Sequence, residues 1–422
     1  MYSYKIEGGT PLRGDISISG SKNAVLGILA AAMLLDGPCE LENVPDISDV
    51  HVMVDLCRSI GATITSKGAY SLRIDPTTIH TYKATGPLVA RIRASYYLLG
   101  ALLGRFGKAS LRMPGGCNFG QRPIDYHLKA FKLMGAKGTN SRDMDNGIIN
   151  LVADNLKGAK VFFDIASVGA TINVMLAACK AQGTTIINNA AKEPHIVDVA
   201  NFLNSMGAKI KGAGTDVIRI EGVKELHGAD YTIIPDRIEA GTYMIAAAMT
   251  GGDVIVDNVL PEHQKPLIAK LREAGAIVEE DIDKVRVIGT GNLKGVSVKT
   301  LPYPGFPTDM QAQMMAMMVI AEGNSKVTET VFENRFMHVD ELNRMGAKIT
   351  TADRSANIEG PAKLVGCDVR ATDLRAGAAM ILAGLVAEGE TRIGDLFHID
   401  RGYEDIVEKF RSLGADIERV DV

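Results

Sequence analysis

The chain has 422 residues, a formal net charge of −4, and a composition that is 46% hydrophobic and 23% charged. Its length exceeds one ordinary hydrophobic core, so at least two domains are expected. The acidic balance, with 5% aromatic residues and no tryptophan, argues against a nucleic-acid-binding surface. The longest apolar runs, of about a dozen residues, are too short to span a bilayer.

A glycine-alanine signal recurs along the whole chain. Each copy follows an apolar stretch and precedes a strand-like run, and successive copies are 68 to 74 residues apart. The glycines are Gly61, Gly135, Gly207, Gly275, Gly346 and Gly414. A near-constant period of this kind indicates one structural unit repeated six times.

Each repeat contains the same elements in the same order. A run that is apolar on every side, such as 24–35, predicts a buried helix. The alternating run 184–190 predicts a strand, the amphipathic run 195–206 predicts a second helix closed by glycine, and 208–222 predicts a hairpin. The expected unit is strand–helix–strand–helix–strand–strand, in the α/β class, arranged around the buried helices.

The sixth repeat ends without its second hairpin strand. The N-terminal segment YKIEGG resembles the missing strand, so we expect residues 1–20 to complete the C-terminal half. The chain would then cross twice between two three-unit domains, one formed by 21–229 and the other by 1–20 plus 230–422. Two linkers between similar domains suggest a hinge with a ligand-binding cleft.

Cations lie at the starts of many expected helices. Helix N-termini present free N–H groups and the positive end of the helix dipole, which favour bound anions. A cation does not stabilise that end of a helix, which indicates another role. The cations in question are Lys22, Arg93, Arg237 and Arg375 on the buried helices and Arg122, Arg335 and Arg401 on the second helices. A site for phosphate or carboxylate is therefore expected near these helix starts.

Short polar side chains at these helix starts allow two interpretations. Taken alone, Ser167, Thr308 and Asp373 are expected to be N-caps. Asp309 is also expected to be a cap, with a general base as the alternative. His127 lies on a second helix, where no carboxylate or metal partner can be placed for it, so we expect a structural role.

Cys117 lies in PGGCNFGQRP, residues 114–123. From the glycine that ends the buried helix to the Gly-Ala glycine, this repeat spans 28 residues and the others span 23 to 25, so the cysteine lies on an insertion. The neighbouring Arg122 and the helix that starts at Pro123 could activate the thiol as nucleophile or acid. Five cysteines without a CxxC pair or a Cys/His cluster predict no disulfide framework, no zinc and a reducing cytoplasm.

Eight motifs follow one another across essentially the whole chain: SGSKNA, PGGCxxGxRPxDxH, SVGAT, PDRIEAGT, FPTDMQAQ, TVFENRFMH, ATDLRA and HIDRGYE. Together they resemble the UDP-N-acetylglucosamine 1-carboxyvinyltransferases (UDP-GlcNAc enolpyruvyl transferases), in particular the second copy that some Gram-positive bacteria carry. The resemblance implies the enolpyruvyl transferase fold, two inside-out α/β domains of three units each.

The resemblance also implies an activity. The enolpyruvyl group of phosphoenolpyruvate would move to the 3′-hydroxyl of UDP-GlcNAc by addition and elimination, releasing phosphate and committing the sugar nucleotide to peptidoglycan synthesis. No metal or organic cofactor is implied, and the partners are the two small-molecule substrates, without nucleic acid or membrane insertion.

Matched positions imply the roles of individual residues. Cys117 would protonate C3 and Asp309 would act as base near the sugar hydroxyl. The phosphoenolpyruvate ligands would be Lys22, Asn23, Cys117, Arg122 and Arg401, of which Lys22 and Arg401 are also catalytic. The UDP-GlcNAc ligands would be Asn23, Arg93, Arg122, Pro123, Ile124, Asp125, Tyr126, Ser167, Val168, Gly169, Asp309 and Val331. A supporting charged shell would comprise Arg335, Asp373 and Arg375.

Two departures from the family pattern and two rival functions remain. Asn118-Phe119 replaces a common Ala-Ile after the cysteine, so the packing of this loop as a lid is expected to differ. Ile165 stands where a lysine is often found, which bears on affinity rather than on reaction type. One rival is an enolpyruvyl transferase that uses shikimate 3-phosphate, a family that does not rely on this cysteine loop. The other is a non-catalytic paralogue that binds UDP-GlcNAc, against which Lys22, Cys117, Asp309 and Arg401 count.

Overall fold

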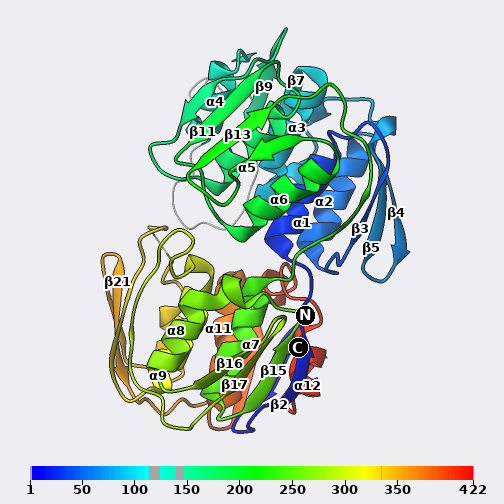
Figure 1. Ribbon diagram of the computed structural model, residues 1–422. Helices are drawn as coiled ribbons and strands as arrows, with labels where there is room; N and C mark the ends of the chain where they lie inside the picture. Colours follow the sequence, from blue (N-terminus) through cyan, green and yellow to red (C-terminus); the bar gives the residue numbers. More distant parts are fainter. Residues whose placement is uncertain (1, 114–123, 139–146, 334, 422) are drawn as a thin grey trace. The chain divides into compact units, whose positions relative to one another are not determined.

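The computed structural model describes residues 2–113, 124–138, 147–333 and 335–421. They form two compact units, the first comprising residues 20–234 and the second residues 2–19 with 235–421. Within these residues, each unit contains three four-stranded sheets and three buried helices, drawn in Figure 1. Each unit is described separately below.

The first unit has sheet orders β14-β3-β5-β4, β6-β7-β9-β8 and β10-β11-β13-β12. Its buried helices are α1 (Lys22–Ala32), α3 (Tyr97–Phe106) and α5 (Val168–Ala178), and its outer helices are α2 (Ser48–Ser59), α4 (Asp125–Leu133) and α6 (Pro194–Ser205). Its strands are β3 (Cys39–Glu42), β4 (Thr63–Gly68), β5 (Ser71–Asp75), β6 (Lys83–Ala84), β7 (Lys108–Arg112), β8 (Lys137–Gly138), β9 (Ile148–Val152), β10 (Lys160–Phe162), β11 (Thr184–Asn188), β12 (Lys209–Lys211), β13 (Val217–Glu221) and β14 (Asp230–Thr232).

The second unit has sheet orders β16-β17-β15-β2, β18-β19-β21-β20 and β22-β23-β1-β24. Its buried helices are α7 (Arg237–Met249), α9 (Gln311–Ile320) and α11 (Leu374–Val386), and its outer helices are α8 (Lys265–Glu273), α10 (Val339–Arg344) and α12 (Ile406–Ser412). Its strands are β1 (Tyr2–Glu7), β2 (Arg13–Ser17), β15 (Asp253–Asp257), β16 (Ile277–Glu280), β17 (Lys284–Ile288), β18 (Ser297–Lys299), β19 (Gly323–Thr328), β20 (Ile349–Ala352), β21 (Ser355–Gly360), β22 (Asp368–Arg370), β23 (Glu390–Gly394) and β24 (Asp416–Asp421).

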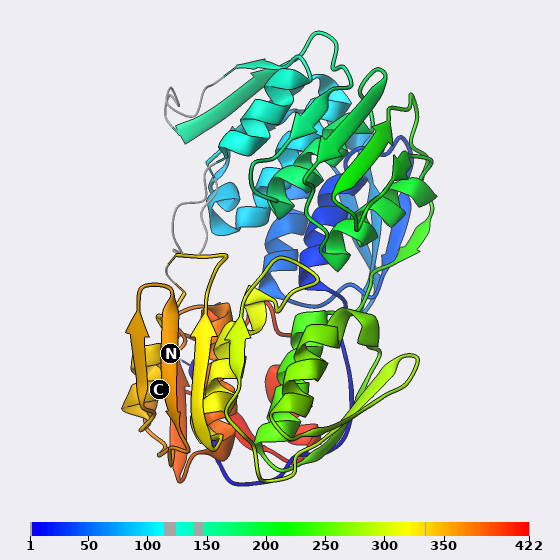
Figure 2. The same cartoon turned by 60° about the vertical axis from the view of Figure 1, so that its left-hand side comes forward.

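The apolar helices lie at the centre of each unit. In the first, α3 packs against α5 and α1, and in the second, α9 packs against α11 and α7. Every residue from Ala170 to Ala178 of α5 is buried. A helix that is apolar on all sides is stable in water only when other elements surround it, and here the sheets do so. Figure 2 shows one of them, β18-β19-β21-β20 in yellow to orange, on the outside of its unit.

The sheets repeat one pattern, which confirms the expected inside-out α/β fold. In each sheet one pair of adjacent strands runs parallel and the other two pairs run antiparallel, as in β10-β11-β13-β12. All six Gly-Ala glycines have φ between 93° and 110°. Only glycine adopts this conformation without strain, so it marks the end of each second helix.

The N-terminal strand completes the last sheet, as expected. β1 pairs antiparallel with both β23 and β24, so that Ile6 lies opposite Thr391 on one side and Ile417 on the other. The other crossing strand differs from the expected boundary. β14 pairs with β3 of the first unit, so that unit extends to residue 234, five residues beyond the expected end at 229.

Because β1 completes the last sheet, Ile6 tests whether the N-terminal strand contributes to the core of the second unit. Ile6 is fully buried, so Ile6→Ala is expected to lower the free energy of unfolding by about 2–5 kcal/mol. Glu7→Ala, at the exposed end of the same strand, should change it by less than about 0.5 kcal/mol. Urea unfolding measures both. Equal effects of the two substitutions would show that the strand does not complete the core.

Candidate functional site

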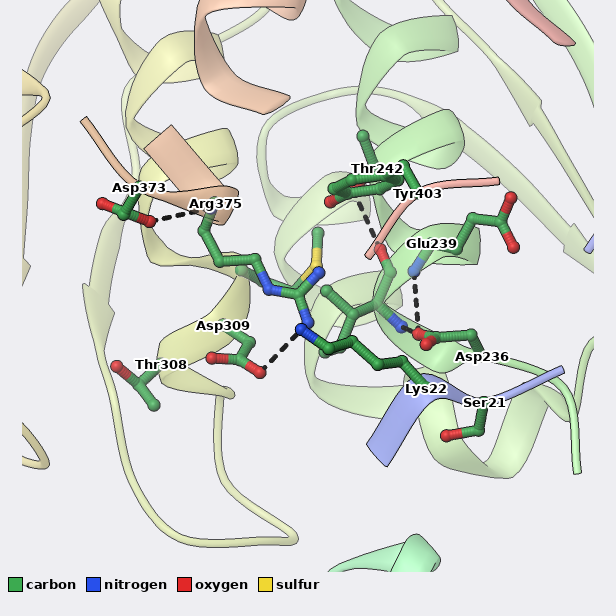
Figure 3. A network of polar contacts seen from close by, with 12 residues as sticks. Ser21, Lys22, Asp236, Glu239, Thr242, Thr308, Asp309, Asp373, Arg375 and Tyr403 are labelled. Atoms are coloured by element: carbon green, nitrogen blue, oxygen red, sulfur yellow. Dashed lines mark hydrogen bonds and ion pairs between the residues drawn. The ribbon is translucent and has the colours of Figure 1, made fainter. Parts of the chain in front are cut away.

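Asp309 lies between two buried arginines in the second unit. It occupies a short 3-10 turn, Thr308–Met310, directly before α9. Its Oδ1 accepts a hydrogen bond from Arg335 Nη2 at 2.8 Å and its Oδ2 accepts one from Arg375 Nη2 at 3.3 Å, the second of which is drawn in Figure 3. The arginine side chains are 6% and 5% exposed, whereas that of Asp309 is 28% exposed. The carboxylate is therefore oriented by buried charge and still reaches solvent.

The sequence pattern predicts an N-cap role for Asp309, but the structure shows that its side chain does not cap a helix. The residue before the 3-10 turn is Pro307, and no side chain caps that turn. Asp373 of the next repeat does cap its helix, because its Oδ1 accepts from the backbone N–H groups of Arg375 at 2.8 Å and Ala376 at 3.1 Å. The same Thr-Asp pair thus has different roles in two repeats.

Arg375 is held by further contacts within its unit. Its guanidinium carbon lies 5.7 Å from the centre of the Tyr403 ring, and the Tyr403 hydroxyl is hydrogen-bonded with Thr242 at 2.9 Å and accepts from Gln313 at 3.3 Å. Burial alone would lower the pKa of Arg375, but Asp309 and the other acidic neighbours raise it above the ordinary value. Arg375 is therefore a permanent cation whose position is set by Tyr403 and Asp309 together.

Arg401 and Val331 also belong to the second unit. Arg401 follows the 3-10 turn Leu396–His398 and is half-buried. Burial is the main cause that lowers the pKa of His398, and the positive charge of Arg401 adds to it. Val331 is 39% exposed, and its backbone N–H donates to Glu329. An expected anion ligand and an expected sugar-nucleotide ligand are thus both accessible from solvent.

Lys22 forms a buried ion pair in the first unit. It is the first residue of α1, after the cap Ser21, and its Nζ lies 2.8 Å from Asp49 Oδ2. The two side chains are 10% and 5% exposed. The carboxylate explains how a lysine can occupy the positive end of a helix. Asn23 follows in the first turn of α1 and is half-buried.

Sequence reasoning missed Asp49 and Glu329. Asp49 lies in the first turn of the second helix of the first repeat, where an acidic residue is also an ordinary stabiliser of the helix dipole. Its only distinguishing property is its burial, at 4% exposure, which the pattern of α2 does not reveal. Glu329 directly follows β19 and has no recognisable motif of its own.

The start of α5 brings several expected nucleotide ligands together in the first unit. Ser167 caps the helix by accepting from Ala170 N–H at 3.3 Å, and Val168 and Gly169 follow, both half-buried. A Cβ on Gly169 would lie 3.2 Å from the His127 ring, so glycine allows the helix to begin against that imidazole. The Arg93 guanidinium lies 5.2 Å from the centre of the Tyr96 ring.

The segment before α4 is placed from Ile124 onward. Ile124 has its side chain in the core, Asp125 is exposed and Tyr126 is half-buried. The Tyr126 ring contacts Phe163 edge-on, with 6.0 Å between ring centres. The expected ligands Cys117, Arg122 and Pro123 lie outside the described residues, so their roles stay predictions.

The four remaining cysteines are free thiols in the part of the chain that the structure describes. Cys39, Cys57 and Cys179 are buried, and burial raises the pKa of each to about 12. A protonated thiol is a poor nucleophile. Cys367 is half-buried.

The described residues include no cluster of His, Cys, Asp or Glu that could hold a metal. No helix among them has the length and apolar character to cross a membrane.

His127 is part of a buried hydrogen-bond network. Asn173 Nδ2 donates to His127 Nδ1 at 2.8 Å and to the Tyr96 carbonyl at 2.9 Å, while Asn173 Oδ1 accepts from Gly100 N–H at 2.7 Å. Burial, assisted by the charge of Arg93, lowers the pKa of His127 to about 3. A neutral imidazole in these contacts fits the structural role expected from the sequence.

The depressed pKa of His127 predicts a pH effect on stability. The stabilisation is complete above about pH 6.5, the ordinary pKa, and is lost as pH falls toward the folded-state value near 3. Within this window the chain should lose about 1.4 kcal/mol per pH unit through this group. His127→Gln should remove that slope between pH 6 and 4 in urea unfolding, and His80→Gln, at an exposed position, should retain it. An unchanged slope in His127→Gln would contradict the assignment.

Comparisons with known proteins identify relatives over the full length. The family model described as EPSP synthase (3-phosphoshikimate 1-carboxyvinyltransferase) matches residues 6–410. UDP-N-acetylglucosamine 1-carboxyvinyltransferase 3 of Caldanaerobacter subterraneus subsp. tengcongensis is 54% identical over 420 residues, and UDP-N-acetylglucosamine 1-carboxyvinyltransferase of Halothermothrix orenii is 56% identical over 420 residues. Each alignment covers 100% of both chains.

Solved structures share the fold. The enolpyruvyl transferase NikO from Streptomyces tendae matches with a TM-score of 0.89 at 28% identity, covering 100% of this chain and 99% of that one. EPSP synthase from Acinetobacter baumannii matches with a TM-score of 0.80 at 20% identity over 100% of both chains, which shows the fold alone. The chain belongs to the EPSP synthase family and, within it, to the UDP-N-acetylglucosamine 1-carboxyvinyltransferases.

Proposed function

We propose that the protein transfers the enolpyruvyl group of phosphoenolpyruvate to the 3′-hydroxyl of UDP-N-acetylglucosamine and releases phosphate, the first committed step of peptidoglycan synthesis. The observation that carries this proposal is the full-length identity of 54–56% to relatives with this activity in their names. The charged groups described above supply suitable chemistry: a solvent-accessible carboxylate held by two buried arginines and a buried lysine at a helix start.

The reaction is an addition followed by an elimination. The 3′-oxygen of the sugar forms a bond to C2 of the enolpyruvyl group, C3 gains a proton, and the hydroxyl loses one. Phosphate then leaves C2 and C3 loses a proton, which restores the double bond. Both steps need proton transfers at defined atoms and fixed positive charge near the phosphate and carboxylate.

Roles follow from this chemistry and from the matched motifs. Asp309 accepts the proton of the sugar hydroxyl, and Cys117 donates a proton to C3. Lys22, Arg122 and Arg401 bind the anionic groups of phosphoenolpyruvate, with Asn23 beside them. Arg335, Asp373 and Arg375 support Asp309 in this proposal.

The nucleotide ligands in this proposal come from four segments. They are Asn23 and Arg93, then Arg122 through Tyr126, then Ser167 through Gly169, and finally Asp309 and Val331. Ile165, which stands where a lysine is often found, is 68% exposed and adds no charge to this set. The family resemblance implies no organic cofactor or metal, and none is assigned in this proposal. We place the protein in the cytoplasm, where its expected unpaired cysteines would stay reduced.

The acceptor is tested by turnover. The purified protein is incubated with phosphoenolpyruvate and either UDP-GlcNAc or shikimate 3-phosphate, and phosphate release is measured. We expect release with UDP-GlcNAc alone. Release with shikimate 3-phosphate alone would identify the protein as the sister activity that the family model describes. Binding of UDP-GlcNAc without turnover would identify a non-catalytic paralogue.

Substitution of Cys117 tests the assigned acid. Cys117→Ser should leave folding largely intact and lower kcat by about 10²- to 10⁴-fold, the usual contribution of general acid–base catalysis. It should also abolish labelling by epoxide phosphonates, which in this family alkylate the matched cysteine. Cys117→Asp should retain activity, because a carboxylic acid can also donate the proton.

The matched control for this thiol is Cys367→Ser. Cys367 is the half-buried free cysteine among the described residues, so it tests whether any accessible thiol is labelled. Labelling and turnover should both persist in this variant. Persistent labelling in Cys117→Ser, or its loss in Cys367→Ser, would assign the reactive thiol to another position.

A further inference from the structure

Glu329 is a buried carboxylate with four hydrogen-bond donors around it. It directly follows β19 and is 1% exposed. Its Oε1 accepts from Thr300 Oγ1 at 2.8 Å and from the backbone N–H groups of Val331 at 2.8 Å and Phe332 at 3.1 Å. Its Oε2 accepts from Thr308 Oγ1 at 2.9 Å. These donors come from three separate segments of the chain.

The hydrogen bond between Thr308 and Glu329 continues to Arg335, and the donor in each step of this network is fixed. Arg335 Nη1 donates to Thr308 Oγ1 at 2.8 Å, and a guanidinium has no acceptor. The Thr308 hydroxyl must therefore direct its own hydrogen toward Glu329. The same guanidinium donates through Nη2 to Asp309 at 2.8 Å. A continuous chain of donors thus links Glu329, Thr308, Arg335 and Asp309.

Glu329 therefore joins two segments that are assigned to the acceptor substrate. One carries Asp309, immediately after Thr308, and the other carries Val331, whose N–H it binds directly. A carboxylate that served only to satisfy a loop would need the contacts with Val331 and Phe332 but not the one with Thr308. Its buried negative charge also favours the arrangement in which Arg335 stays beside Thr308.

We propose that Glu329 is a positioning residue for the acceptor substrate: it sets Asp309 through Thr308 and Arg335, and sets Val331 through its backbone N–H. This inference rests on the proposed function for the identity of the acceptor. Glu329 does not itself touch the reacting atoms in this assignment. The consequence is a specific kinetic effect on the acceptor, separate from any effect on phosphoenolpyruvate.

Glu329→Gln tests the donor direction in this network of hydrogen bonds. The amide nitrogen of glutamine is a donor, so wherever it is placed it faces a donor of the native network. At the Oε2 position it would compete with Arg335 for Thr308 and leave the threonine hydrogen without its acceptor. We expect KM for UDP-GlcNAc to rise about tenfold, kcat to fall, and KM for phosphoenolpyruvate to change less than twofold.

Thr308 supplies a second pair of variants in case Glu329→Gln does not fold. Thr308→Val removes the hydroxyl but leaves the other three hydrogen bonds of Glu329, and should reproduce the increase in KM for UDP-GlcNAc. Thr308→Ser restores a hydroxyl and should recover most of the activity that the valine loses. Thermal unfolding of each variant reports whether stability alone accounts for the kinetics.

Glu341→Gln is the matched control. Glu341 is also a buried carboxylate of this unit, at 7% exposure, and it accepts from Arg370 N–H at 3.1 Å and pairs with Arg344 at 3.3 Å. Its substitution should lower stability while leaving both KM values within twofold. The proposal is overturned if Glu329→Gln and Thr308→Val change the acceptor KM no more than this control does.

The same variants distinguish failure of the positioning role from failure of the proposed function. If the unsubstituted protein does not turn over UDP-GlcNAc, that function is wrong, and the comparison is made on KM for shikimate 3-phosphate or, without turnover, on Kd for UDP-GlcNAc by calorimetry. A selective loss of acceptor affinity in both variants still supports the positioning role. Equal affinities in all variants, or no binding of either acceptor by the parent, overturn it.

Discussion

The second unit depends on a buried carboxylate–guanidinium cluster. Arg335 and Arg375 are almost completely removed from water, and such charges are stable only when paired and hydrogen-bonded. Asp309 binds both, although the arginines follow it by 26 and 66 residues. The starts of α9 and α11 and the segment after β19 must therefore meet around one carboxylate. That requirement places the Asp309 carboxylate at a defined point while leaving it partly open to solvent.

The repeated architecture explains why the charged groups gather at helix starts. The central helices are buried on every side and consist mainly of apolar or small side chains, and buried polar residues among them, such as Asn173, are hydrogen-bonded. Their first turns accommodate further polar side chains, because free N–H groups there need partners. Ser167 and Asp373 satisfy those groups as caps. Lys22 instead binds Asp49, so the same part of the repeat also holds a buried ion pair.

Much of this arrangement could be predicted, and the failures have a clear cause. Glycines of positive φ appear in the sequence as the Gly-Ala signal, and the apolar runs identify the central helices. The cap role was predicted correctly for Asp373 and wrongly for Asp309. Asp373 has the extended backbone of an N-cap, with φ −161° and ψ 178°, whereas Asp309 lies inside a 3-10 turn. Identical Thr-Asp pairs do not reveal that difference.

The amino-acid sequence alone determined the six repeats, their element order, the use of the N-terminal strand in the last sheet and the family motifs. These features depend on local periodicity and on residue types at fixed spacing. Only the tertiary structure decided that Asp49 pairs with Lys22, that Asp309 lies between two arginines, and that Glu329 joins the segments of Thr308 and Val331. Apart from the local bond between Glu329 and Val331, those contacts connect residues 21 to 66 positions apart along the chain. Their formation depends on how the repeats pack, which no local pattern specifies.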